Sequence, residues 1–355
     1  MNQIRKFRSL LTEKMPAILL TGAPNRQYAT GAIIDEGMCL ITADRCDYYT
    51  DSRYTETARK QLEGVAEVTE VRADRPYTAC IQAVLDEAGI TRLGVEQEKL
   101  THGAFLRLQE KLRAELIPCQ RTLDGLRAAK EPWEQEIMRR AQAIADGVFS
   151  ELLPVIRAGM TEKELEAELI YRLYRAGAEG LSFPPIVVSG PNSSMPHGVA
   201  GDRKLAPGDF ITMDFGVIYR GYCSDMTRTV ALGHATEKMR EVYGVVLHAQ
   251  EAAISATRAG LTGKQIDAAA RDVITQAGYG RYFGHSYGHS LGIEIHEAPN
   301  CAPSCETPMP AGAVTSAEPG IYLPGEFGVR IEDVVILTPE GCENITRSPK
   351  ELIIL

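Results

Sequence analysis

Three of the 7 histidines in this chain of 355 residues crowd into one short stretch, GHSYGHSLGIEIHEAP at 284–299. They are His285, His289 and His296. A neutral imidazole binds divalent metal ions, and a histidine N–H also donates hydrogen bonds to a substrate. The spacing alone leaves three interpretations open: all three bind a metal ion, one of them does, or the stretch is an ordinary polar loop.

Two aspartates occur in the apolar stretch FITMDFGVIYRGYCSDMTRTV, at 210–230. Asp214 and Asp225 are expected in neighbouring strands of a hairpin, side by side on one face. Strand interiors disfavour aspartate, and adjacent carboxylates repel each other, so the pair must share a proton or a cation. The alternative, two solvent-facing aspartates on a sheet edge, suits Asp225 better than Asp214.

A second acidic hairpin follows near the end of the chain. Glu318 in SAEPGIY stands at a strand end, and Glu332 in GVRIEDVVIL lies within a β-forming run. Strand alternation puts Arg330 on the same face as Glu332, so a weak surface ion pair is the alternative interpretation. Four carboxylates and one imidazole suit two divalent cations, with Mn, Co, Fe or Zn favoured over a thiolate site.

The elements that must position these residues suggest a mixed α/β protein of two domains, 1–125 and 126–355. In the first domain, short apolar runs alternate with helical stretches, which predicts a small mixed sheet with covering helices. Residues 121–131 show no strand pattern and are expected to link the domains. The second domain repeats a coarse pattern of two helices and an acidic hairpin. Its helices are expected at 131–156, 161–177, 237–257 and 262–278.

Composition excludes several partners. The net charge of −9 without a basic run argues against nucleic acid and against anionic membranes, and no apolar run approaches the roughly 20 residues of a membrane span. The N-terminus lacks the apolar segment and cleavage site of a signal peptide, so a cytoplasmic protein is expected. The 8 cysteines show no zinc-binding spacing and are expected to be free thiols, several of them buried.

Five ordered strings in this chain resemble the pita-bread metallopeptidase family, specifically its Xaa-Pro branch of aminopeptidase P and prolidase. They cover residues 184–338 almost continuously. Two upstream strings, PNRQYATG and YTDSRYTETA, are similar to the creatinase-type N-terminal domain of that branch. The catalytic strings are SGPNSSMPHG, MDFGVIYRGYCSDMTRT, GHSYGHSLGIEIHE, SAEPGIY and GVRIEDVV.

The resemblance implies a pita-bread catalytic domain with pseudo-two-fold αβ halves and two metal ions per subunit. Asp214 would bind one metal ion, Asp225 and Glu332 would bridge both, and His289 and Glu318 would complete the second. Manganese is expected first, with cobalt, iron or zinc as alternatives. The residue types and their strand positions indicate the same four carboxylates, but they do not select His289 among the three histidines.

The family pattern gives other residues substrate roles. His296 would face the cavity from an extended strand and bind the substrate carbonyl as charge develops. His197, in PHG, would contact the substrate near the scissile bond, and His285 would shape the proline pocket; a purely structural role remains open for both. Arg330 resembles an arginine that orients a ligand carboxylate. Ser290 replaces the glycine that usually follows the metal histidine, which leaves the ligands intact but puts substrate preference in doubt.

The implied reaction is attack by metal-activated hydroxide on the Xaa-Pro bond at a peptide N-terminus, with Glu318 moving the proton to the leaving proline nitrogen. The expected substrate is therefore a peptide with proline at its second position. The resemblance favours a homodimeric Xaa-Pro aminopeptidase. The alternatives are an Xaa-Pro dipeptidase and, less favoured because all five ligand positions are intact, a metal-free binding protein or a creatinase-like hydrolase.

Overall fold

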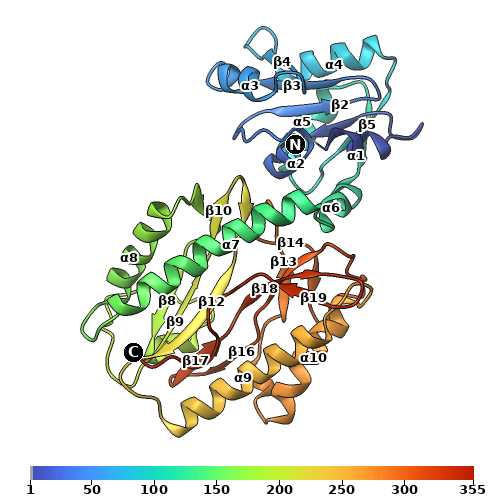
Figure 1. Ribbon diagram of the computed structural model, residues 1–355. Helices are drawn as coiled ribbons and strands as arrows, with labels where there is room; N and C mark the ends of the chain where they lie inside the picture. Colours follow the sequence, from blue (N-terminus) through green and yellow to red (C-terminus); the bar gives the residue numbers. More distant parts are fainter. Residues whose placement is uncertain (1–2) are drawn as a thin grey trace. The chain divides into compact units, whose positions relative to one another are not determined.

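A computed structural model describes residues 3–355 of the chain. The chain divides into two compact units, Met1–Arg127 and Ala128–Leu355. Each unit combines helices with β-sheet, so the mixed α/β class predicted from the alternation of apolar runs is confirmed. Figure 1 shows both units in sequence colours.

The N-terminal unit is built on one mixed sheet of six strands in the order β4-β3-β2-β1-β5-β6. The sheet contains both antiparallel and parallel pairs. Strand β1 pairs with β2, and β2 with β3, in antiparallel orientation, whereas β1 pairs with β5 in parallel orientation. The strands are β1 (Ile18–Leu20), β2 (Met38–Ile41), β3 (Cys46–Thr50), β4 (Glu67–Glu70), β5 (Arg92–Val95) and β6 (Glu115–Pro118). The helices are α1 (Ile4–Ser9), α2 (Ala23–Thr30), α3 (Thr55–Gln61), α4 (Tyr77–Glu87) and α5 (His102–Lys111).

The segment expected to be a linker is largely helical. Residues Gln120–Ala128 form α6, and α7 begins at Pro132 and runs to Leu152. Glu131 caps α7 in a capping box with Glu134, and the first-turn proline needs no hydrogen-bond acceptor. A segment without a strand pattern can still form a short amphipathic helix, as α6 does.

The C-terminal unit consists of two halves, each with a helix pair followed by strands. Figure 1 shows the strands lying between the α7–α8 pair and the α9–α10 pair. The remaining helices are α8 (Glu162–Arg175), α9 (Glu237–Ala256) and α10 (Gly263–Gln276), with short 3₁₀ turns at Leu153–Val155, Gly190–Ser194 and Gly280–Tyr282. The first half contains β7 (Gly180–Leu181), β8 (Ile186–Ser189), β9 (Phe210–Phe215), β10 (Val217–Tyr219), β11 (Tyr222–Cys223) and β12 (Met226–Ala231). The second half contains β13 (Gly288–Ser290), β14 (Glu297–Cys301), β15 (Val314–Ala317), β16 (Gly320–Leu323), β17 (Phe327–Arg330), β18 (Asp333–Leu337) and β19 (Cys342–Asn344).

Each half has its own hydrophobic core between its helices and its strands. Phe149 and Leu169 pack with Phe215 in the first half, whereas Val246 and Ile266 belong to the core of the second. Burial of each such side chain contributes about 1.5–3 kcal/mol. The two cores hold the central strands rigidly, which is what a precise site on their ends requires.

A buried arginine joins the two halves and the C-terminal segment. Arg228 in β12 is 1% exposed, and its guanidinium donates 2.7 Å to Asp333 Oδ1 and 2.8 Å to the carbonyl of Ser348. Beside it, the backbone of Ala231 exchanges hydrogen bonds of 2.9 Å with Ile353 and Leu355. The end of the chain therefore closes onto the strand that follows Asp225.

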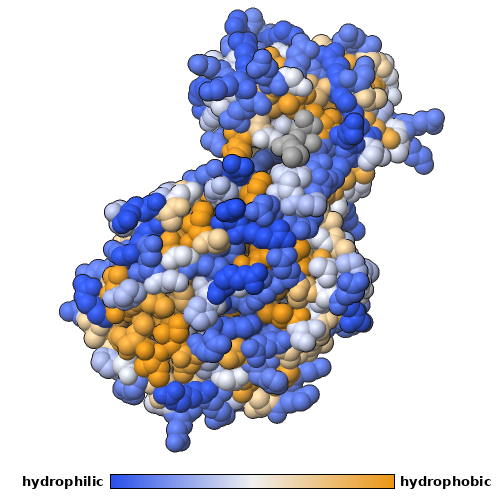
Figure 2. Space-filling model, in the orientation of Figure 1, coloured by the Kyte–Doolittle hydropathy of each residue, from blue (hydrophilic) through white to orange (hydrophobic). Residues whose placement is uncertain are grey.

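Figure 2 shows hydrophilic residues over much of the visible surface, with separate hydrophobic areas between them. Within residues 3–355, no helix has both the length and the hydropathy needed to cross a bilayer. The eight cysteines are free, and six of them are buried, as the sequence predicted. The large hydrophobic side chains that are exposed are Ile33, Leu106, Tyr171, Tyr174, Met195, Val199 and Ile354.

Candidate metal centre

The first acidic hairpin brings Asp214 and Asp225 to the same end of two paired strands. Asp214 lies opposite Thr227 in the antiparallel pairing of β9 with β12. The sequence suggested that Asp225 lies within the second strand, but it immediately precedes β12. Both side chains are buried, so the alternative of two solvent-facing aspartates on an edge is wrong.

The second hairpin supplies the other two carboxylates. Glu332 lies in the two-residue connection between β17 and β18, where its N–H donates 3.1 Å to the carbonyl of Thr227. The Thr227 hydroxyl donates 2.7 Å to Glu332 Oε2, so backbone and side chain both fix this glutamate against the first half. Glu318 directly follows β15 and accepts a hydrogen bond of 3.0 Å from the hydroxyl of Ser316.

His289, the middle histidine of the crowded stretch, lies in β13 and reaches this carboxylate group. Its Nε2 is 3.4 Å from Asp225 Oδ2 and 3.4 Å from Glu318 Oε1. Single ligand atoms of Asp225, His289 and Glu332 all lie within 4.8 Å of one another. One imidazole nitrogen among several carboxylate oxygens is a donor set typical of divalent transition metals.

The pKa values of the buried carboxylates also indicate a site for a cation. Burial raises the pKa of Asp225 and of Glu332 well above the usual range, and neighbouring carboxylates raise both further. Burial likewise raises the pKa of Asp214, although Arg330 opposes the shift. Among residues 3–355, no donor contacts the buried Oδ1 of Asp214. A bound cation would compensate these charges and give that oxygen a partner, so the donor set fits a metal centre.

Arg330 lies behind the carboxylates and is only 3% exposed. Its guanidinium donates 2.5 Å to Asp214 Oδ2, 3.0 Å to the Thr227 hydroxyl and 2.8 Å to the Tyr322 hydroxyl. Burial alone would lower the pKa of Arg330, but Tyr322 and Asp214 raise it well above its usual value. The alternative of an Arg330–Glu332 surface pair is therefore wrong, since the arginine is buried and pairs with Asp214.

The other three predicted site histidines lie around this group. His285 Nε2 is 3.0 Å from the Tyr322 hydroxyl, which links it to Arg330. The ring centroid of His296 is 4.4 Å from that of His289 in an edge-to-face arrangement. His197 lies on an exposed loop between β8 and β9, and its charge helps to lower the pKa of His296, after burial and after His289.

The sequence predicted that His296 would lie on an extended strand, and this is wrong. Residues 292–296 form a series of bends, and β14 begins only at Glu297. The Glu297 side chain accepts hydrogen bonds from the backbone of Ile293 (3.1 Å) and Glu294 (3.2 Å), which folds the segment back. The apparent alternation of isoleucines arises from a compact bend and not from a strand.

Sequence reasoning also missed Tyr322, which connects His285 to Arg330. It ends the SAEPGIY string, but its position in β16 is typical of an ordinary core tyrosine of a hairpin. Two hydroxyls of the MDFGVIYRGYCSDMTRT string have different partners: Thr227 donates 2.7 Å to Glu332, whereas Tyr222 donates 2.9 Å to Glu134. Ser290 is fully buried and donates to the carbonyl of Pro299, so the serine is accommodated within the sheet.

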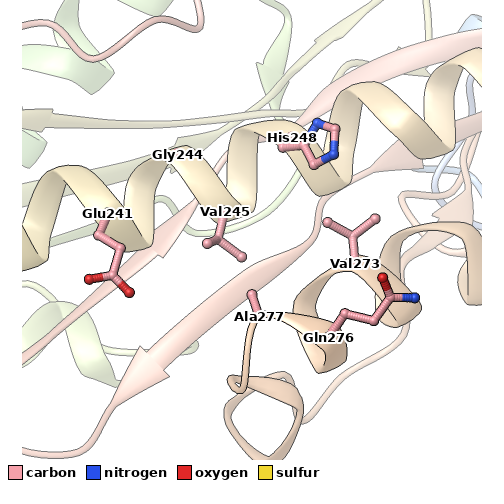
Figure 3. Close-up of a pocket in the computed structure, with 7 residues that line it drawn as sticks. All are labelled: Glu241, Gly244, Val245, His248, Val273, Gln276 and Ala277. Atoms are coloured by element: carbon pink, nitrogen blue, oxygen red, sulfur yellow. The ribbon is translucent and has the colours of Figure 1, made fainter.

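A separate surface cavity of about 400 Å³ lies between α9 and α10 (Figure 3). It contains none of the predicted site residues, although one histidine outside the motifs, His248, lines it. The lining residues are Glu241, Gly244, Val245, His248, Val273, Gln276 and Ala277.

Comparison with known proteins places this geometry in a family. Residues 136–339 match the model of metallopeptidase family M24, and residues 3–129 match the creatinase/prolidase N-terminal domain. A solved Xaa-Pro dipeptidase from Bacillus anthracis is 44% identical, with a TM-score of 0.95 and 99% of each chain covered. An X-Pro aminopeptidase from Thermotoga maritima MSB8 is 36% identical, with a TM-score of 0.94 and both chains fully covered.

A curated Xaa-Pro dipeptidase from Pyrococcus horikoshii is 35% identical over 339 residues, which cover 95% of this chain and 94% of the relative. The family resemblance and the pita-bread fold predicted from the sequence are thereby confirmed. The chain belongs to metallopeptidase family M24, with a creatinase/prolidase-type N-terminal domain preceding its catalytic domain.

Proposed function

We propose that this protein is a dinuclear metallo-exopeptidase that hydrolyses the Xaa-Pro bond at the N-terminus of peptides. The observation that carries the proposal is that single ligand atoms of Asp225, His289 and Glu332 lie within 4.8 Å of one another. Glu318 Oε1 lies 3.4 Å from His289 Nε2, and the buried Asp214 is close enough for its charge to raise the pKa of Asp225. In this proposal Asp214, Asp225, His289, Glu318 and Glu332 would hold the two ions. Manganese is the first candidate, because oxygen-rich ligation suits it, with cobalt, iron and zinc as alternatives.

The surrounding side chains have distinct tasks in this reaction. When bound, the cations lower the pKa of a water molecule and polarise the scissile carbonyl. Glu318 accepts the proton of that water and delivers it to the departing proline nitrogen. His296, beside His289, donates a hydrogen bond to the carbonyl oxygen as negative charge develops there. His197 contacts the substrate near the scissile bond, and His285 shapes the pocket for the proline ring.

Among Xaa-Pro peptidases we favour an aminopeptidase that accepts peptides longer than two residues. A strict dipeptidase needs a cationic group to hold the free carboxylate of proline. The arginine at this site, Arg330, is buried and already hydrogen-bonded to Asp214, Thr227 and Tyr322, so it does not serve that purpose. The second candidate, an Xaa-Pro dipeptidase, is favoured by the similarity to the dipeptidase of Bacillus anthracis.

The deciding experiment compares hydrolysis of Xaa-Pro-Yaa with hydrolysis of Xaa-Pro, using protein loaded with manganese or cobalt. Release of the first residue from the tripeptide supports the aminopeptidase, and cleavage of the dipeptide alone supports the second candidate. Asp225→Asn and a chelated sample serve as controls, and both should lose activity. Full activity after chelation would refute the metal-dependent mechanism and favour a metal-free relative.

We also propose that the protein is a homodimer that functions in the cytoplasm. The dimer follows from the resemblance to Xaa-Pro peptidases, and eight free cysteines suit a reducing compartment. Sedimentation at working concentrations tests the assembly, and a monomer would contradict it.

A further inference from the structure

A fully buried ion pair lies beside the metal centre, and none of the roles discussed above involves it. Lys130, just before α7, places its Nζ 2.9 Å from Oε2 of Glu297, the first residue of β14. The two side chains are 1% and 2% exposed, although 167 residues separate them in the chain. Because both charges lose their hydration, such a pair is weak evidence for stability by itself, and its geometry must be explained otherwise.

The second oxygen of the same carboxylate organises a bend. Oε1 of Glu297 accepts the backbone N–H groups of Ile293 and Glu294, at 3.1 and 3.2 Å. A Cβ atom added at Gly292 would lie 2.8 Å from Glu297 Oε2 and 2.9 Å from Cε of Lys130. The bend is thus folded tightly around the ion pair, and the absence of a side chain at position 292 is part of the packing.

Both ends of this arrangement are anchored to rigid parts of the catalytic domain. The backbone N–H of Lys130 donates 2.8 Å to the carbonyl of Gly312, and its carbonyl accepts 2.9 Å from the side chain of Gln135 in α7. On the other side, the N–H of Cys223 donates 2.7 Å to the carbonyl of Gly292. Cys223 lies two residues before Asp225, so the bend is tied directly to the segment that supplies a metal-site carboxylate.

The bend ends in His296, whose ring packs edge-to-face against His289. His296 is adjacent to Glu297 in the chain, so any shift of the glutamate carries the imidazole with it. We propose that Lys130 and Glu297 are positioning residues that hold His296 at the metal centre. The inference rests on the proposed function for the role of His296, but the placement of its ring can be measured without activity.

The kinetic test uses Lys130→Met, which removes the cation but keeps an unbranched chain. If His296 acts mainly in the transition state, kcat and kcat/KM should fall together, about 10–100-fold, with KM nearly unchanged. Metal stoichiometry should stay at the wild-type value. In a His296→Ala background, Lys130→Met should cause little further loss, because the two residues act through one group.

Two further variants guard against a simple folding defect. Gly292→Ala leaves both charges in place yet crowds the pair, and it should reproduce the kinetic effect. Arg139→Met is the matched control. Arg139 also belongs to α7, and its Nη2 lies 2.7 Å from Oε2 of Glu343, which is not one of the site residues. This variant should leave kcat and KM unchanged. Two results would overturn the proposal. One is a double variant of Lys130→Met and His296→Ala in which the two losses of activity multiply. The other is an unchanged kcat in both Lys130→Met and Gly292→Ala.

The second readout is the proton NMR signal of the His296 ring in zinc-loaded protein, assigned with the His296→Ala variant. Lys130→Met should move this resonance, because the ring leaves its contact with His289, while Arg139→Met should not. An unmoved resonance would overturn the positioning role. If the wild-type protein cleaves no Xaa-Pro substrate but the resonance moves as expected, the proposed function fails and the positioning inference stands.

Discussion

Thr227→Val removes one hydroxyl group from the metal centre and keeps the shape of the side chain. In the wild type this hydroxyl donates 2.7 Å to Glu332 Oε2 and accepts 3.0 Å from Nε of Arg330. Thr227 is fully buried, so water cannot replace either interaction. The hydrogen bond from Thr227 also lowers the pKa of Glu332, against the larger effect of burial. Without it, Glu332 is harder to ionise, and a metal ion must displace its proton.

A hydrogen bond to a charged group contributes about 1.5–3 kcal/mol. Because about 1.4 kcal/mol corresponds to tenfold in a binding constant, we expect Mn²⁺ to bind Thr227→Val about 10–100-fold more weakly. Isothermal titration of the metal-free protein with manganese measures this loss directly. The number of protons released on binding, obtained by repeating the titration in buffers of different ionisation enthalpy, should rise near neutral pH.

Thr229→Val is the matched control for this experiment. Thr229 lies two residues further along β12, is equally buried, and donates 3.0 Å to the backbone carbonyl of Arg330 rather than to a carboxylate. Its loss should lower the free energy of unfolding but leave manganese affinity unchanged. Wild-type affinity in Thr227→Val, or equal weakening in both variants, would refute the assignment of Glu332 as a ligand oriented by Thr227.

Three further predictions concern the surroundings of the site. Burial and mutual repulsion raise the pKa values of Asp225 and Glu332, so the metal-free protein should lose stability as the pH rises from acid to neutral. The increase in Tm caused by manganese should therefore grow with pH. An increase that is independent of pH would contradict this prediction. The buried carboxylate of Glu162 accepts hydrogen bonds from both ends of the loop that carries His197, and Glu162→Gln replaces it with a neutral amide. In this variant kcat/KM, measured by steady-state kinetics, should fall about tenfold or more, while metal analysis should show an unchanged metal content. Arg271→Met removes the donor to the carbonyl of His285 and should raise KM for the proline substrate; an unchanged KM would separate His285 from the proline pocket.

The sequence was informative where a residue was in conflict with its surroundings. Asp214 in an apolar strand and Glu332 in a β-forming run stood out because neither is comfortable there without a partner, and the structure brings both to one buried group. Helix starts were equally readable, since the capping box of Thr161 and Glu164 predicts where α8 begins. These signals are local, and local physics is what a sequence pattern records.

What could not be predicted depends on contacts between distant segments. The alternation in GIEIHE looks like a strand because the pattern does not show that Glu297 turns back to accept the N–H groups of its own neighbours. The resemblance indicated that Arg330 orients a ligand carboxylate, but the sequence could not show which one, because its partner Asp214 lies in the other half. Tyr322 ends the SAEPGIY string, but the string does not reveal its role, which arises from the two distant groups that its hydroxyl joins.

The closure of the C-terminal segment onto Arg228 has a consequence for how the protein is made. Asp214 and Arg330 are 116 residues apart, and the carbonyl of Ser348 that receives Arg228 lies later still. While the ribosome is still synthesising the second hairpin, the aspartates of the first lack both Arg330 and Glu332. The proposed ligand set is therefore complete only after Glu332 has been made, and a chain truncated before that residue should fail to acquire its ions.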